Sequence, residues 1–251
     1  MKKNLLLLIL AASFLSLTAQ DCSDLFFSQY LEGSGNNKGV EIFNPTDKII
    51  DLSKYWVARY SNGSVTYTAG GLTQLEGFLQ PYSTFVLVNG QTVSSEISPA
   101  CDPAMQALAD MLDHDYPAPT YMNGNDAIAL LKSEEKNIDN AVSVDLFGEI
   151  GLGALIADET GWSNIKDTTV TYHVDSVTET QGQVINYIVQ DLDINGQNFG
   201  PFWLAMTRNH TLVRKPWVKQ GVKENPHPFL VFAEWDTVPG DENQWDSLNF
   251  H

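Results

Sequence analysis

The segment from Asp191 to Gly196 has the side chains and spacing of a site for a hard cation. Oxygen-bearing side chains alternate at Asp191, Asp193 and Asn195, and Gly196 permits a tight turn around the ion. Calcium is the expected occupant because it prefers carboxylate and amide oxygens. The full calcium loop would place a bidentate glutamate at the twelfth position, where this chain has Phe202. A ligand from elsewhere would have to complete the cage, and the alternative is a plain acidic turn between two strands.

Three tryptophans are candidates for glycan binding, because sugars stack on exposed aromatic faces. They are Trp162, Trp203 and Trp217, which lie in or beside the stretch 161–201. Large aromatic side chains also dominate β cores, so packing in the core or at its rim is the competing interpretation for each.

The residues that would carry hydrolysis form no recognisable pattern. The histidines lack the HExxH spacing of a zinc site, and the serines lack a GxSxG elbow. The histidines stand singly at His114, His173, His210, His227 and His251. Adjacent acids say little about acid–base catalysis in so acidic a chain. We therefore predict no catalytic residue, and a catalytic group assembled from distant residues is the alternative.

The first twenty residues have the pattern of a secretory signal. Two lysines precede an apolar run at 5–17, and cleavage is expected after Ala19 or Gln20. No other apolar run approaches the roughly 20 residues of a membrane-spanning helix, so we expect an exported protein, periplasmic or extracellular. A lipid anchor at Cys22 is not expected, because Asp21 stands where lipidation signals have a small residue.

The chain contains two cysteines, Cys22 and Cys101. Export would bring them into an oxidising compartment, where they are candidates for a disulfide. Such a bridge would close a loop of about 80 residues, for which the chain-entropy estimate is an upper limit of roughly 4 to 5 kcal/mol. Two unpaired thiols are the alternative.

The charge balance limits the partners. The chain has 14 Lys and Arg against 31 Asp and Glu, a formal net charge of −17. Signal cleavage would remove two lysines and no acid. A field of this sign repels polyanions, whose binding depends on Lys and Arg at phosphates. We therefore do not expect nucleic acid as a partner, whereas a protein or a cell-surface glycan fits.

Short strand-like runs between turn signals predict an all-β fold. In the opening hairpin, Gly33 to Lys38 form the turn, and Val40 and Ile42 would face one side of the second strand with Glu41 on the other. Further strands are expected at 55–60, 65–68, 83–89, 127–131, 142–146, 169–174, 184–189, 212–215 and 229–232. This number of short strands is typical of a β-sandwich.

One helix is expected between Asp102, which would cap it, and Pro117. Pro103 suits the first turn, and the apolar residues Met105, Leu108, Met111 and Leu112 recur at helical spacing. We interpret this stripe as core packing.

Several segments together resemble the lamin tail domain family in its secreted bacterial form. They are the hairpin at 25–44, DLSKYWVARYSNG at 51–63, NGNDAIALL at 123–131, TLVRK at 211–215 and the ending at 233–251. The resemblance implies one immunoglobulin-like β-sandwich over residues 21–251, following a signal peptide at 1–20. It also implies that Trp56 and Trp235 are buried. The stretch 161–201 fits the family least, and we interpret it as an inserted hairpin region.

The resemblance indicates a fold that hosts many unrelated functions. Our first hypothesis is an exported, non-catalytic module that binds a protein, a glycan or a cell-surface polymer through loops on a rigid sandwich. The second is an accessory subunit of a hydrolase, or a weak secreted hydrolase of the nuclease or phosphoesterase type, because secreted members of this family often accompany such enzymes. An enzyme needs a concave pocket with converging polar groups, which distinguishes the two.

Overall fold

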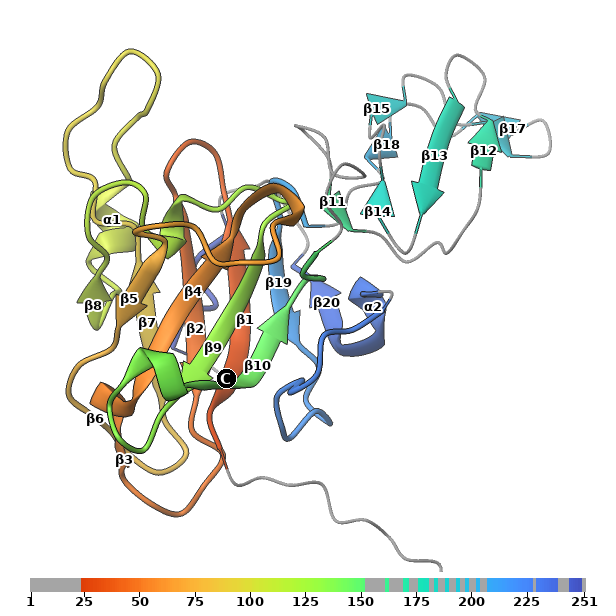
Figure 1. Ribbon diagram of the computed structural model, residues 1–251. Coiled ribbons are helices and arrows are strands. Elements are labelled where there is room, and N and C mark those ends of the chain that lie inside the picture. Colours follow the sequence, from red (N-terminus) through yellow and green to blue (C-terminus); the bar gives the residue numbers. More distant parts are fainter. Residues whose placement is uncertain are drawn as a thin grey trace, which may run out of the picture.

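The main body consists of two β-sheets that face each other across a common core (Figure 1). The computed structural model describes residues 24–151, 161–162, 207–227, 229–238 and 244–249, with short strands between 169 and 203. One sheet has the strand order β20-β19-β1-β2-β7-β8 and the other β10-β9-β4-β5. The all-β, immunoglobulin-like sandwich expected from the sequence is confirmed.

The strands are short, and those of the two main sheets pair antiparallel except for β7 and β8, which run parallel. The six-stranded sheet consists of β1 (Phe26–Glu32), β2 (Lys38–Phe43), β7 (Thr84–Val88), β8 (Met111–Leu112), β19 (Thr211–Arg214) and β20 (Trp235–Thr237). The four-stranded sheet consists of β4 (Tyr55–Tyr60), β5 (Leu72–Gln74), β9 (Ala127–Lys132) and β10 (Val142–Phe147). A two-stranded ribbon pairs β3 (Ile50–Asp51) with β6 (Phe78–Leu79).

The helices within the described residues are few and short. The α-helices are α1 (Pro103–Gln106) and α2 (Val231–Glu234), and the 3-10 turns are η1 (Leu52–Lys54), η2 (Ser61–Gly63), η3 (Pro119–Tyr121) and η4 (Ile138–Asn140). No helix in the described ranges is long and apolar enough to span a bilayer.

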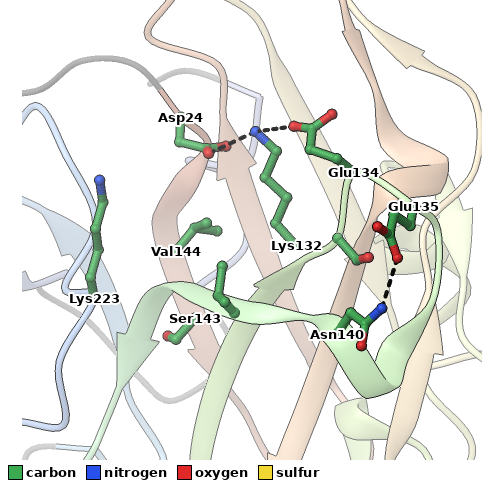
Figure 2. Close-up of a pocket in the computed structure, with 10 residues that line it drawn as sticks. Asp24, Lys132, Glu134, Glu135, Asn140, Ser143, Val144 and Lys223 are labelled. Carbon is green, nitrogen blue, oxygen red and sulfur yellow. Dashed lines mark hydrogen bonds and ion pairs between the residues drawn. The ribbon is translucent and has the colours of Figure 1, made fainter.

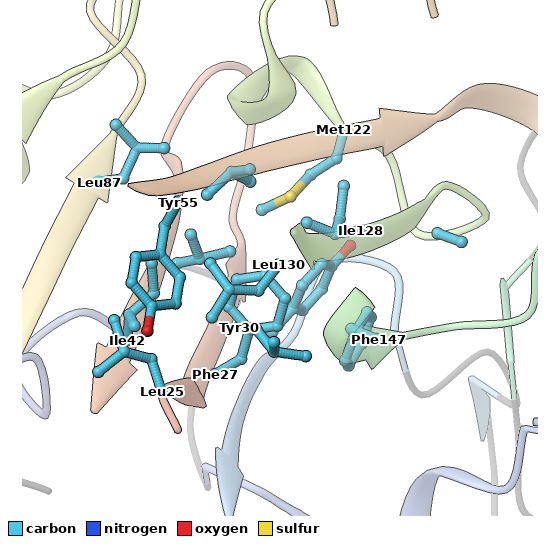
Figure 3. Packing of buried hydrophobic residues seen from close by; sticks show 14 of the residues in the cluster. Leu25, Phe27, Tyr30, Ile42, Tyr55, Leu87, Met122, Ile128, Leu130 and Phe147 are labelled. Carbon is cyan, nitrogen blue, oxygen red and sulfur yellow. The ribbon is translucent and has the colours of Figure 1, made fainter. Parts of the chain in front are cut away.

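Alternation along the strands brings apolar side chains of both sheets together between the layers. Ile42 and Leu87 come from the six-stranded sheet, and Tyr55 and Leu130 come from the four-stranded sheet (Figure 3). Each is almost fully buried. Burying a large apolar side chain contributes about 1.5–3 kcal/mol, so this layer is the main source of stability.

The outer face of the six-stranded sheet buries Glu41, as the period of two in β2 predicts. Its carboxylate accepts hydrogen bonds from Ser28 Oγ at 2.6 Å, from Gln29 Nε2 at 3.2 Å and from the backbone N–H of Asn249. Burial raises the pKa of Glu41, and these hydrogen bonds oppose the rise. Glu41 therefore ties a distant segment, 244–249, to β2.

A buried ion pair connects the two sheets. Asp145 of β10 and Arg214 of β19 lie 2.8 Å apart with fully buried side chains. Asp145 also accepts hydrogen bonds from the backbone N–H groups of Phe27 at 2.7 Å and of Val222 at 2.7 Å. Because four donors, including the N–H of Leu146, converge on this carboxylate, the charge is well compensated.

The helix predicted between Asp102 and Pro117 is wrong beyond its first turn. Asp102 caps it as expected by accepting a hydrogen bond from the N–H of Ala104 at 2.8 Å, but α1 ends at Gln106. The Asp110 carboxylate accepts a hydrogen bond from the N–H of Val86, and β8 then pairs in parallel with β7. Tertiary hydrogen bonds to an open sheet edge thus outweigh the helical spacing of the apolar residues.

Two predicted strands are also wrong. The segment 65–68 is an exposed loop, in which the hydroxyl of Ser64 bonds to the backbone of Thr66 and closes a local turn. The segment 229–232 enters α2, whose N-terminal residue Val231 is buried. The strands expected at 55–60, 83–89, 127–131, 142–146 and 212–215 are confirmed to within two residues at each end.

Residues 161–203, which include the stretch 161–201 predicted as an inserted hairpin region, contain strands that pair with one another in small antiparallel sheets. They are β11 (Gly161–Trp162), β12 (Thr169–Thr171), β13 (Ser176–Thr180), β14 (Gln183–Val184), β15 (Ile188–Val189), β16 (Asp193–Ile194), β17 (Gln197–Asn198) and β18 (Phe202–Trp203). The predicted domain limits, 1–20 and 21–251, stay predictions.

Candidate functional site

The predicted calcium segment falls largely outside the described residues. Asp191 and Asn195 lie outside them, and Asp193 begins β16, where only the backbone is described. Within the described part of the chain, no group of three His, Cys, Asp or Glu side chains is placed to hold a metal ion. The calcium site stays a prediction.

The three candidate tryptophans differ in position. Trp217 is 64% exposed, with Lys215 Nζ 5.3 Å from its ring centroid, so it offers an aromatic surface. Trp203 lies in β18, of which only the backbone is described. Trp162 is fully buried and packs edge-on against Phe147 and Phe229, with centroids 6.5 and 5.7 Å away.

A glycan-binding role for Trp162 is therefore wrong, and core packing is the correct interpretation. Its ring has no exposed face, because the aromatic cluster of the sandwich extends to it. Trp56 and Trp235 are buried, 5% and 1% exposed, as the family resemblance implied.

Only one of the two cysteines lies within the described residues. Cys101 is buried, and Cys22 lies outside those residues. Burial raises the pKa of Cys101 to about 11, which suppresses the reactive thiolate. The disulfide stays a prediction.

A ring nitrogen of each described histidine lies within hydrogen-bond distance of a backbone carbonyl oxygen or of a carboxylate. His114 Nδ1 and His210 Nδ1 lie 2.8 and 2.6 Å from backbone carbonyl oxygens. His227 Nδ1 lies 2.5 Å from Oε1 of Glu149, whose side chain is buried. An acid beside an exposed imidazole is one part of a hydrolytic triad, but the contact alone contains no nucleophile.

One end of the sandwich carries a charged groove of about 470 Å³ (Figure 2). It is lined by Asp24, Lys132, Ser133, Glu134, Glu135, Asn140, Val142, Ser143, Val144 and Lys223. Lys132 Nζ lies 3.0 Å from both Asp24 Oδ2 and Glu134 Oε1, and Asn140 Nδ2 donates to Glu135 Oε2 at 2.7 Å.

These charges serve the fold. Burial lowers the pKa of Lys132, but its hydrogen bonds to Asp24 and Glu134 outweigh burial and raise it overall. Tyr55 OH donates to the other oxygen of Asp24 at 2.5 Å, and Lys54 pairs with Glu134 at 2.5 Å. The charged groove therefore fastens the start of β1 to β9 and β4, and its ionised groups are already engaged.

The opposite end of the sandwich carries a second groove between loops, which we call the aromatic groove. It has a volume of about 430 Å³ and is lined by Gly90, Gln91, Thr92, Val93, Asp115, Tyr116 and Tyr121. The rings of Tyr116 and Tyr121 are perpendicular, with centroids 5.4 Å apart. Tyr116 is 70% exposed, whereas the aromatic side chains of the core are almost fully buried.

A buried arginine fixes the loop that presents Tyr116. Arg59 of β4 donates to the carbonyl oxygens of Tyr121 at 2.9 Å and Pro117 at 3.2 Å, and pairs with Asp126 at 3.2 Å. Its guanidinium carbon lies 5.8 Å from the Tyr116 ring centroid. A planar guanidinium can serve several acceptors at once, so Arg59 fixes both ends of this short loop.

A buried carboxylate fixes the same loop from the other side. Asp113 accepts hydrogen bonds from Thr73 Oγ1 at 2.5 Å and from the N–H and hydroxyl of Thr120 at 3.1 and 3.0 Å. Gly90 permits the close approach of the neighbouring loop, since a methyl group there would lie 2.1 Å from the carbonyl oxygen of Asp113. The aromatic groove is therefore pre-formed.

The aromatic groove is electrostatically negative. Asp115 is exposed, and its carboxylate makes no hydrogen bond or ion pair with another described residue. Burial raises the pKa of Tyr121; a backbone hydrogen bond with Tyr116 opposes the rise, and the charge of Asp115 adds to it. None of the residues lining the groove is basic.

Sequence reasoning missed this groove, because its residues stand apart in the chain and tyrosine is common at both core and surface positions. The signal available was the segment HDYPAPTY at 114–121, where prolines and polar residues indicate a loop and leave its tyrosines without a strand to pack in.

Comparison with known proteins gives one family. The sequence model described as Lamin Tail Domain matches residues 18–145, which is just over half of the chain. The match covers β1 to β9 and most of β10, including β4, which contains Arg59, and Asp126, which precedes β9. No curated protein and no solved structure matches the chain.

Proposed function

The chain belongs to the lamin tail domain family, and we propose that it is an exported, non-catalytic binding module. The module would bind a protein, a glycan or a cell-surface polymer through the loop end of the sandwich that holds the aromatic groove. Loops on a rigid β-scaffold are a common place for recognition.

The observation that carries this proposal is the fixed presentation of Tyr116. An exposed aromatic ring leaves apolar surface in contact with water, which does not stabilise the fold. Nevertheless, the buried side chains of Arg59 and Asp113 hydrogen-bond to the loop that holds this ring in place. Pre-organisation of this kind reduces the entropy that binding must overcome. Val93, at 75% exposure, and Ile97, at 95%, extend the apolar surface on the adjacent loop.

The geometry gives less support to hydrolysis. Neither groove is lined by Glu149 or His227, so the contact between these two residues does not face either groove. A catalytic site would bring a nucleophile, a base and an oxyanion site within hydrogen-bond reach.

Retention on the producing cell's envelope tests the binding proposal. We expect labelled protein comprising residues 21–251 to bind the isolated envelope fraction saturably, and Tyr116→Ala to reduce that binding. Phe78→Ala is the matched control, because Phe78 is also 70% exposed but lies in β6 at the other end of the sandwich. No saturable retention, or equal losses in both variants, would contradict the proposal.

Export is tested separately by fractionating cells that produce the full chain. We expect the protein outside the cytoplasm, with mass spectrometry showing a new N-terminus after Ala19 or Gln20. A cytoplasmic protein that keeps residues 1–20 would exclude export.

A further inference from the structure

We propose that the aromatic groove binds a cationic side chain, lysine or arginine, from a basic segment of a protein partner. This inference rests on the proposed function, since it names the class of ligand for the same loop end. Three features carry it: the paired tyrosine rings, the available carboxylate, and the saturated amide of Gln91 in the same groove.

The first feature is the pair of rings. A cation is attracted to the face of an aromatic ring within about 6 Å of the centroid. Arg59 already lies 5.8 Å from the Tyr116 centroid on the buried side, while most of the ring remains exposed. Tyr121 stands perpendicular to Tyr116, so the two rings form a corner. A flexible ammonium or guanidinium group can lie in such a corner with its stem against the rings.

The second feature is charge. The exposed Asp115 carboxylate can pair with the cation, and no basic residue lines the groove. The charge of Arg59 is compensated by Asp126, so it does not repel a ligand as a free cation would. The formal net charge of −17 adds a field that attracts basic partners and steers their approach.

The third feature argues against a neutral sugar. Sugar recognition needs several polar groups with hydrogen-bonding capacity to spare. Gln91 Oε1 already accepts hydrogen bonds from Asn36, Ser98 and Tyr121, each at 3.0 Å. Its Nε2 donates to the carbonyl oxygens of Val93 at 2.9 Å and Ser98 at 2.7 Å. The amide is saturated, which leaves Asp115 as the charged acceptor of the groove.

The test is an NMR titration of ¹⁵N-labelled protein comprising residues 21–251 with an acetylated, amidated tri-lysine peptide at physiological salt. We expect saturable amide shifts concentrated at 90–93 and 115–121. Tyr116→Ala should weaken binding about three- to fivefold, and Tyr116→Phe should keep it, because the ring face and not the hydroxyl meets the cation. Asp115→Asn should weaken binding about threefold or more.

Matched controls separate the groove from general attraction to an acidic protein. Asp47→Asn removes the same charge from an exposed turn beyond the other end of β2, and Phe78→Ala removes an equally exposed ring. Asp47→Asn should weaken binding only slightly, because salt screens a charge that lies far from the groove. Phe78→Ala should leave binding unchanged. The inference would be overturned if the amide shifts were spread over the surface and Asp47→Asn and Asp115→Asn weakened peptide binding equally.

Two further outcomes would also overturn it. One is no binding of tri-lysine, and the other is groove shifts produced by neutral maltotriose but not by the peptide. In either case, envelope retention that still depends on Tyr116 would leave the proposed function standing. Loss of that dependence would remove the proposed function itself.

Discussion

Replacing Arg59 with methionine should destabilise the sandwich and loosen the aromatic groove. The change removes the charge opposite Asp126, whose side chain is 1% exposed, and two hydrogen bonds to the loop carbonyls of Pro117 and Tyr121. Breaking a buried ion pair by removing one partner costs about 3–5 kcal/mol. Methionine retains much of the apolar stem, so the loss is mainly electrostatic.

The expected cost lies near the lower limit of that range, because the Asp126 carboxylate keeps other donors. These are the backbone N–H of Asn62 at 2.9 Å and that of Asn123 at 3.3 Å. About 3 kcal/mol corresponds to a fall in Tm of about 6–12 °C for a domain of this size. Arg59→Lys keeps the charge but lacks the planar fork, and should cost about 1–2 kcal/mol.

The assay is thermal unfolding monitored by calorimetry. Amide hydrogen exchange at 115–121 is a second readout. Burial raises the pKa of Asp126, and the charge of Arg59 opposes this. In the folded state Asp126 therefore takes up its proton at a higher pH than in the unfolded chain, and the neutral acid needs no counter-charge. The cost of Arg59→Met should consequently shrink as pH falls toward 4.

A loss below about 1 kcal/mol at pH 7 would refute this reasoning, since the pair would then behave like an exposed one. Unchanged exchange at 115–121 would refute the claim that Arg59 fixes the loop.

Two further predictions concern single titratable groups. Hydrogen bonds from Ser53, followed by pairing with Lys136, lower the pKa of Asp51 to about 2. The ionised form thus stabilises the fold above the unfolded pKa, and this contribution is lost as pH falls toward 2. In a carboxyl-carbon NMR titration, Ser53→Ala should raise this pKa more than Lys136→Ala does; the reverse order would reject the assignment. In a Cys22→Ser variant, the Cys101 thiol should resist alkylation at pH 8 until the protein unfolds, whereas rapid labelling of the folded protein would show that it is not buried.

Local patterns predicted the strands that pair with near neighbours. The opening hairpin and β4 follow from alternation and turn residues, because a strand with one buried face must keep a period of two. The burial of Val40 and Ile42 opposite Glu41 in β2 is a direct consequence.

The sequence could not show what depends on contacts between distant residues. The segment containing Met111 satisfies a helical pattern, and only the free edge of β7 makes it a strand. Trp162 and Trp217 look alike in sequence, but one meets the aromatic core and the other does not.

The aromatic groove has the same origin. Arg59 and Asp126 are 67 positions apart, and the loops that contain Gly90 and Asp115 meet only after both sheets have formed. Their residue types indicated a loop, but not a binding surface.

A crystal structure of residues 21–251 with bound tri-lysine peptide tests the central claim most directly. The account predicts a lysine ammonium against the Tyr116 ring and within hydrogen-bond distance of the Asp115 carboxylate. A peptide bound elsewhere, with the groove between Tyr116 and Tyr121 empty, would contradict it.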